Sequence, residues 1–68
     1  MRLTLNGCEQ DVDEGVTIDA VLSLLEVRPG ARGVAVAVDA QVVPRAEWPH
    51  RRLAPGERVE VLTAMQGG

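Results

Sequence analysis

The chain has 68 residues, which is enough for one domain but too few for a cleft lined by several converging catalytic groups. Hydrophobic residues make up 46% of it and its mean hydropathy is +0.02, values typical of a globular chain and not of a disordered one. The net charge of −3 and the single aromatic residue, Trp48, exclude the basic, aromatic-rich surface of a nucleic-acid binder. A role that depends on partner proteins is therefore favoured over self-contained catalysis.

Two features bear on where the protein works. Cys8 is the only cysteine, so an internal disulfide is excluded and a reducing compartment is expected. The first residues lack the apolar stretch of a signal peptide, and no apolar run approaches the roughly 20 residues that cross a bilayer. We expect a cytoplasmic protein with no membrane contact.

The first half of the sequence predicts a hairpin followed by a helix. Residues 1–6 alternate apolar and polar side chains, Asn6-Gly7 favours a tight turn, and residues 8–12 return as a second strand. Thr17 is suited to cap a helix that should stop near Val27, before Pro29. Its apolar face is expected to consist of residues spaced three or four apart: Ile18, Val21, Leu22 and Leu25.

The second half predicts three more strands. Residues 34–38 form an unbroken apolar run, which indicates a strand buried on both faces. A turn at 39–40, a short strand at 41–43 and a single helical turn around Trp48 should follow. Pro55-Gly56 is typical of a tight turn, and residues 58–63 alternate again as the last strand.

The predicted order is β-β-α-β-β-β, with one main helix across a mixed sheet of four or five strands. This is an α+β architecture, and at this length it indicates the β-grasp, or ubiquitin-like, fold. The domain is expected to cover residues 1–63 and a flexible C-terminal tail residues 64–68.

Three residues could in principle carry chemistry within the domain. His50, the only histidine, has no partner at metal-ligand or triad spacing, so we expect it to be exposed to solvent. Cys8 is expected to be a small, half-buried apolar side chain. Trp48 is expected to cap the aliphatic core, with its indole N–H bonded to a carbonyl or to water. No catalytic residue, metal site or permanently bound cofactor is predicted.

The tail, residues 64–68, offers a different chemistry. Gly67 and Gly68 have no Cβ atoms, so this end can enter a narrow channel in any backbone conformation. Five residues reach at most about 17 Å, enough to place the terminal carboxylate in another protein's active site. That carboxylate is ionised at neutral pH and can attack the α-phosphate of ATP, giving an acyl-adenylate that accepts sulfur.

Four segments of the sequence together form a specific pattern. The most specific is Val42-Val43-Pro44-Arg45 with Trp48 three residues on. The others are Asn6-Gly7, Leu53-Ala54-Pro55-Gly56-Glu57 and the closing Ala64-Met65-Gln66-Gly67-Gly68. With this pattern, the whole chain resembles the ThiS family of sulfur carriers in thiamine biosynthesis. Glu57 stands where the family often has Asp.

The resemblance implies a carrier that is a monomer when free and is a co-substrate of its partner enzymes. An adenylating enzyme related to ubiquitin-activating enzymes would use Mg-ATP on Gly68, and Gln66 and Gly67 would give access to it. Sulfur, drawn indirectly from a cysteine desulfurase, would form a thiocarboxylate that thiazole synthase accepts. The resemblance also places a docking surface around the last strand and residues 43–48, at Val43, Arg45, Trp48 and Leu62.

Other readings of the sequence stay open. The small subunit of molybdopterin synthase shares the fold and the tail chemistry, although the Val-Pro-Arg-x-x-Trp segment and the short length argue against it. A ubiquitin-like protein modifier is a second alternative, although a chain without lysine cannot build polymers on its own side chains. A β-grasp interaction module with an idle tail is a third.

Overall fold

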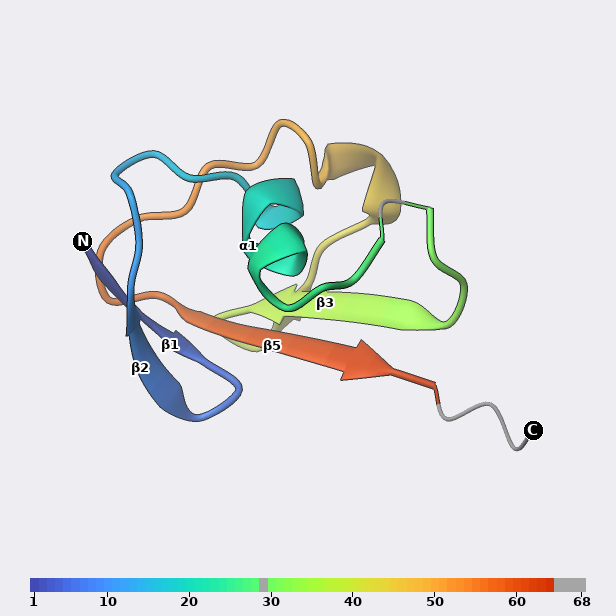
Figure 1. Cartoon of the computed structure of the whole chain (residues 1–68), viewed down its shortest axis with the longest axis horizontal. Coiled ribbons are helices and arrows are strands. Elements are labelled where there is room, and N and C mark those ends of the chain that lie inside the picture. The colour runs from blue at the N-terminus through green and yellow to red at the C-terminus, as the bar shows by residue number, and fades with distance from the viewer. Residues whose placement is uncertain (29, 65–68) are drawn as a thin grey trace.

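A computed structural model describes residues 1–28 and 30–64, and it opens with the expected hairpin (Figure 1). β1 (Arg2–Leu5) pairs antiparallel with β2 (Cys8–Asp11). The turn between them has φ of 49° at Asn6 and 84° at Gly7, the left-handed conformations that a two-residue hairpin turn needs. β1 buries Leu3 and Leu5, whereas all four residues of β2 are exposed. The hairpin therefore contributes to the core through β1 alone.

The helix α1 (Ile18–Leu24) begins as the sequence predicts and ends earlier. The Thr17 hydroxyl accepts a hydrogen bond from the Ala20 N–H, and Ile18, Val21 and Leu22 are buried. At its C-terminus, Glu26 has φ of 61°, its N–H bonds to the Ser23 carbonyl (3.0 Å), and the Val27 N–H bonds to the Leu22 carbonyl (2.9 Å).

These two bonds form a Schellman motif, which closes a helix through one left-handed residue. The expected end near Val27 is therefore wrong, because the chain turns away at Glu26 and leaves the helical path. Leu25, expected on the buried face, is 37% exposed for the same reason.

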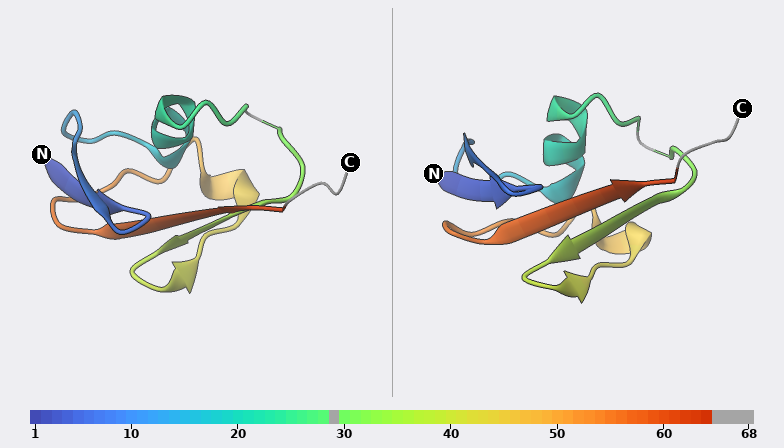
Figure 2. Two further views of the ribbon diagram at one scale, coloured as in Figure 1. Left: turned by 60° about the horizontal axis from the view of Figure 1, so that its bottom comes forward. Right: turned by 90° about the horizontal axis from the view of Figure 1, so that it is seen from below.

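The next segment forms β3 (Val34–Val38), β4 (Gln41–Val42) and the 3-10 turn η1 (Arg45–Glu47). The expectation that residues 34–38 are buried on both faces is wrong. Val36 and Val38 are buried, but Ala35 on the opposite face is exposed. The reason is architectural, since α1 covers one face of the sheet and leaves the other open (Figure 2).

The last strand, β5 (Arg58–Thr63), lies in the centre of the sheet. It pairs in parallel with β1 and antiparallel with β3, which gives the strand order β2-β1-β5-β3-β4. The turn before it forms at Pro55-Gly56, where Gly56 has φ of 81°. One helix on a mixed five-stranded sheet confirms the α+β, β-grasp architecture.

The core is aliphatic except for one aromatic side chain. It joins one face of the sheet to α1 and to the segment after β4, and consists of Leu3, Leu5, Ile18, Val21, Leu22, Val36, Val38, Val43, Trp48, Leu53, Val59 and Val61. The side chains of residues 1–28 and 30–64 leave no buried polar atom without a hydrogen-bond partner. Across the same residues, α1 is too short to cross a membrane, and no other helix is long and apolar enough to do so.

The side chain of Asn6 extends the parallel pairing of β1 with β5. That pairing covers only Thr4 with Arg58 and Leu5 with Val59. Beyond it, the Asn6 N–H bonds to the Val59 carbonyl (2.9 Å), and Asn6 Oδ1 accepts a hydrogen bond from the Val61 N–H (2.8 Å). The residue thus makes the turn and also satisfies a backbone donor 55 positions away along the chain.

We expect Asn6→Ala to lower the free energy of unfolding by about 2–3 kcal/mol, because the Val61 N–H loses its acceptor and alanine is strained at this positive φ. Asn6→Asp keeps the acceptor oxygen and tolerates the conformation, so it is the matched control and should cost less than half as much. Urea unfolding followed by circular dichroism measures both. Equal losses in the two variants would contradict a role for the Asn6 oxygen.

Candidate functional site

The chemistry-bearing residues predicted in the tail, Gln66, Gly67 and Gly68, lie outside the described residues, and so does Met65. The base of the tail is described. β5 ends at Thr63, and the next residue, Ala64, donates its N–H to the Gly33 carbonyl (2.6 Å). The predicted boundary between the domain and the tail, after residue 63, stays a prediction.

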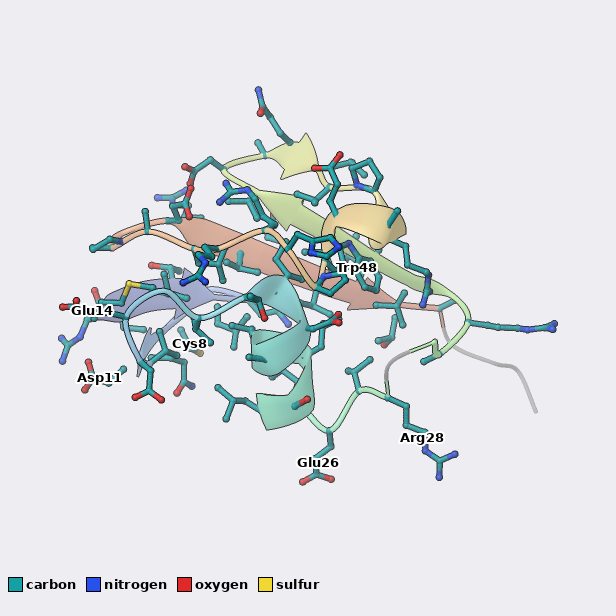
Figure 3. All side chains as sticks on the ribbon, turned by 90° about the horizontal axis from the view of Figure 1, so that it is seen from above. Cys8, Asp11, Glu14, Glu26, Arg28 and Trp48 are labelled. Carbon is teal, nitrogen blue, oxygen red and sulfur yellow. The ribbon has the colours of Figure 1, made fainter. Side chains whose placement is uncertain are left out.

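Val43 and Trp48, two of the predicted docking residues, are core residues. Their side chains are 8% and 4% exposed, and Figure 3 shows Trp48 between α1 and η1. The indole N–H of Trp48 donates to the Val43 carbonyl (2.9 Å). This confirms that Trp48 caps the core with its indole N–H bonded to a carbonyl. It also corrects the docking surface, because a partner cannot contact side chains that are already covered.

Arg45 and Leu62, the other two predicted docking residues, are exposed. The Arg45 guanidinium lies over the Trp48 ring, 4.7 Å from its centroid, and donates to the Ala31 carbonyl (2.5 Å). Leu62 is 67% exposed on the open face of the sheet, two residues before the base of the tail. Of the four, these two can meet a partner.

Leu62 belongs to a small apolar patch on the open face of the sheet. It lies opposite Ala35 in the pairing of β5 with β3, and Val42 lies opposite Ala37 in the pairing of β3 with β4. Side chains paired in this way share a face, and Val42 is 76% exposed. We call these four residues, Ala35, Ala37, Val42 and Leu62, the open-face patch.

Sequence reasoning missed three members of this patch: Ala35, Ala37 and Val42. The signal that could have found the two alanines is the alternation of valine and alanine along residues 34–38. The larger side chains at 36 and 38 fill the core and the smaller ones face outward. The side of Val42 depends on its register with β3, which no local pattern encodes.

Cys8 and His50 have no arranged site around them in the described residues. His50 is exposed, as expected. Cys8 is also exposed, so the expected half-buried side chain is wrong. The cause is that β2 is an edge strand whose four residues are all exposed to solvent. Within residues 1–28 and 30–64, no group of three or more His, Cys, Asp or Glu residues could hold a metal ion.

Arg2 lies at the centre of an exposed cluster of charges on the β1–β2 hairpin. Its guanidinium bonds to the Asp11 carboxylate (3.1 Å) and to Glu9 (3.3 Å). The hydrogen bond from Arg2, with its positive charge, holds the pKa of Asp11 below its ordinary value, and the same bond raises the pKa of Arg2. All three side chains are more than half exposed, so solvent screens the attraction and the cluster contributes little to stability.

The second half of the chain has a more enclosed ion pair. The two oxygens of Glu57 accept hydrogen bonds from the Ala54 N–H (2.7 Å) and from Arg51 (3.0 Å). Glu57 therefore closes the Pro55-Gly56 turn through its side chain as well as its backbone. The Glu57 side chain thus reaches two donors that precede the turn, Arg51 and Ala54.

The geometry defines a class of protein. A helix packed on one face of a mixed sheet, with the C-terminal strand in the middle and the opposite face open, is a ubiquitin-like β-grasp domain. Its candidate functional region is the tail and the open-face patch beside the end of β5. The described residues present nothing resembling an enclosed catalytic centre.

Comparison with known proteins narrows this class to one family. The sequence model of the ThiS family matches residues 3–68, so the chain belongs to the ThiS family. The crystal structure of a thiamine biosynthesis protein (ThiS) from Geobacter metallireducens superposes with a TM-score of 0.79 and 34% identity, over 100% of both chains. The sulfur carrier protein ThiS of Escherichia coli (strain K12) is 26% identical over 100% of both chains.

A third relative is a much longer protein. The thiazole synthase of Paramagnetospirillum magneticum is 29% identical over 68 residues, which are 100% of this chain and 20% of that protein. The chain therefore spans only a fifth of the length of this relative. The likeness extends over the whole β-grasp domain, not over a single motif.

We expect Trp48→Phe to lower the free energy of unfolding by about 2–4 kcal/mol, because it leaves a void in the core and removes the donor to the Val43 carbonyl. Ala46→Ser, an exposed change within η1, is the control and should leave stability within about 0.5 kcal/mol of the parent. Urea unfolding followed by far-ultraviolet circular dichroism compares them. A Trp48→Phe protein as stable as the parent would contradict the anchoring role of the indole.

Proposed function

We propose that this protein is the sulfur carrier for the thiazole moiety of thiamine, and that the carboxylate of Gly68 carries the sulfur. The observation that carries the proposal is the family match, which runs through residue 68 and includes the terminal diglycine. The names of the Geobacter and Escherichia relatives, both matched over 100% of their length, support it. The protein acts as a co-substrate and not as an enzyme.

The chemistry takes place in two balanced steps on Gly68. A carboxylate oxygen attacks the α-phosphorus of Mg-ATP in the partner's site and displaces pyrophosphate, which leaves an acyl-adenylate. Hydrosulfide, or an equivalent sulfur nucleophile, then attacks the acyl carbon and displaces AMP, which leaves a thiocarboxylate. If the donor is a persulfide formed by a cysteine desulfurase, a thiol must supply two further electrons to release the sulfur.

Two enzymes are the proposed partners. An adenylating enzyme binds the carrier with Mg-ATP, and thiazole synthase takes the sulfur. One thiazole synthase contains a region similar to this chain, which supports the proposed interaction with thiazole synthase. A cytoplasmic location forms part of the proposal, since the exposed thiol of Cys8 suits a reducing compartment.

The molybdopterin synthase small subunit is a weaker candidate for this chain. It would use the same diglycine end, so the tail cannot separate the two functions. The family match and the Trp48–Val43 anchor, made by the Val-Pro-Arg-x-x-Trp segment, favour the thiamine carrier.

Conversion of the Gly68 carboxylate to a thiocarboxylate would change the mass of the protein. Incubation with the adenylating enzyme, Mg-ATP and sulfide should increase the intact mass by about 16 Da, the exchange of one oxygen for sulfur. Deletion of Gly68 should abolish this gain completely, because the next carboxylate is one residue short of the reacting position. Intact-mass spectrometry measures both proteins, and the untreated sample tests that the chain ends at Gly68.

A control carrier that is converted by the same enzyme shows that the assay works. If the control is converted and the parent chain is not, the carrier function is wrong and an interaction module becomes the better reading. If the Gly68 deletion still gains sulfur, the reaction does not require the carboxylate of Gly68, and the assignment of that residue is wrong.

The open-face patch is proposed to contact the adenylating enzyme. Leu62→Arg should raise the KM of the adenylating enzyme for the carrier at least about tenfold, because a buried leucine contact contributes about 1.5–3 kcal/mol and the added charge must be desolvated. Leu24→Arg is the matched control, since Leu24 is 64% exposed on α1 compared with 67% for Leu62. Initial rates of pyrophosphate release against carrier concentration measure the effect, and equal effects of the two changes would contradict docking at the patch.

A further inference from the structure

We infer that Arg45 is a positioning residue that fixes the direction in which the tail leaves the domain. This inference rests on the proposed function and extends it to a residue with no chemistry of its own. A chain of contacts connects Arg45 to Ala64 through the loop between α1 and β3. Each step is a contact or a short stretch of backbone between described residues.

The first contacts attach Arg45 to the core. Its guanidinium lies 4.7 Å from the centroid of the Trp48 ring. Trp48 is 4% exposed and is itself held by the bond from its indole N–H to the Val43 carbonyl. The exposed arginine therefore lies on a buried ring that is fixed in place, and the stacking offsets part of the entropy that its long side chain loses on ordering.

The second contact attaches Arg45 to the loop. Its Nη2 donates to the Ala31 carbonyl (2.5 Å), and the loop at this point bends twice, with φ of 81° at Gly30 and 72° at Gly33. Both glycines adopt left-handed conformations. Because glycine populates positive and negative φ about equally, the sequence alone does not fix the conformation of this loop. A charged donor fixed to the core therefore orders a segment that its own sequence leaves free.

The third contact attaches the loop to the tail. Gly33, two residues after Ala31, accepts the hydrogen bond from the Ala64 N–H (2.6 Å). This bond continues the β3–β5 ladder by one step beyond the pairing of Val34 with Thr63. The orientation of the Gly33 carbonyl depends on the loop conformation, and Arg45 holds that conformation from the other side.

The consequence is a fixed starting point for the reacting end. The four residues after Ala64 reach at most about 14 Å, so the place and direction of Ala64 determine which volume Gly68 can enter. When Ala64 is released, the tether becomes longer and its directions more numerous, so fewer encounters place the carboxylate at a partner's reaction centre. Arg45 should therefore affect how often the tail enters the partner, and not the reaction that follows.

Arginine is suited to this role and lysine is not. The guanidinium can stack on the indole and donate from its edge at the same time, whereas an ammonium has no flat face to stack. Arg45→Lys keeps the charge and tests the geometry, and Arg45→Met keeps the apolar stem and tests the whole group. Arg32→Met, an exposed change in the same loop, is the matched control.

The experiment measures amide hydrogen exchange by NMR and adenylation kinetics on the same proteins. In both Arg45 variants, exchange at the Ala64 N–H should become about five- to tenfold faster, while the core amides of Val36 and Val61 keep their rates. The kcat/KM for the carrier should fall about fivefold with kcat unchanged. Gly33→Ala, which is strained at φ of 72°, should reproduce the faster exchange at Ala64.

The outcomes separate this inference from the proposed function. Faster exchange at Ala64 alone, with a parent protein that is never adenylated, upholds the positioning by Arg45 and overturns the carrier function. Unchanged exchange at Ala64 overturns the inference, because Arg45 then does not hold Ala64. Equal acceleration at Ala64, Val36 and Val61 also overturns it, because Arg45 then affects only the stability of the whole domain. The same shift in Arg32→Met would also overturn it.

Discussion

The rest of the structure depends on one constraint, which is that the last strand of the chain lies in the middle of the sheet. β5 must find β1 from the other end of the sequence, and their parallel pairing spans only two residue pairs. The side chain of Asn6 and the antiparallel pairing with β3 complete its hydrogen bonding. Because these contacts are distant in sequence, the sheet can close only after the whole domain has been made.

The central position of β5 also determines how the functional end is presented. β1 and Asn6 hold the first part of the strand, up to Val61, and β3 pairs with it up to Thr63. Gly33 then accepts the hydrogen bond from Ala64, so the domain holds the chain to within four residues of Gly68. Only four residues therefore separate the last described contact, at Ala64, from the carboxylate that the proposed function uses.

A single helix accounts for the two different faces of the sheet. α1 covers one face, where the aliphatic side chains and Trp48 gather, and the open-face patch remains on the other. Within residues 1–28 and 30–64, α1 is the only α-helix, and it packs on the core face. Leu62 and Val42 are therefore exposed on the other face, where they form part of an apolar surface beside the end of β5 on which a partner can dock.

The success of sequence reasoning here depended on whether the deciding chemistry was local. The Asn6-Gly7 turn, the cap at Thr17 and the Pro55-Gly56 turn are fixed by residues next to each other, and the structure confirms all three. The role of Trp48 was also predicted, because a core that is otherwise aliphatic can use its one large aromatic side chain as a cap. The diglycine stood out for the same reason, as a pattern complete in two residues.

Most of the errors have the opposite character, because they depend on residues that are distant in the sequence. The exposure of Ala35 depends on which sheet face α1 covers, and that of Cys8 on β2 becoming an edge strand. The resemblance placed Val43 on a docking surface, yet its side chain lies in the core and its carbonyl accepts the hydrogen bond from the Trp48 indole. The early helix end at Glu26 needed a left-handed conformation that a glutamate only rarely adopts.

This division between local and distant information bears on what distinguishes one diglycine carrier from another. In the proposed function, the chemical steps take place on the terminal carboxylate of Gly68, so carriers with different products can share those steps. Discrimination must then reside in surfaces formed by tertiary structure, such as the open-face patch, where Ala35 meets Leu62 across two strands. The residues that decide the pathway are therefore the ones that a motif reveals least, and the paired strands of β3, β4 and β5 are where they are to be found.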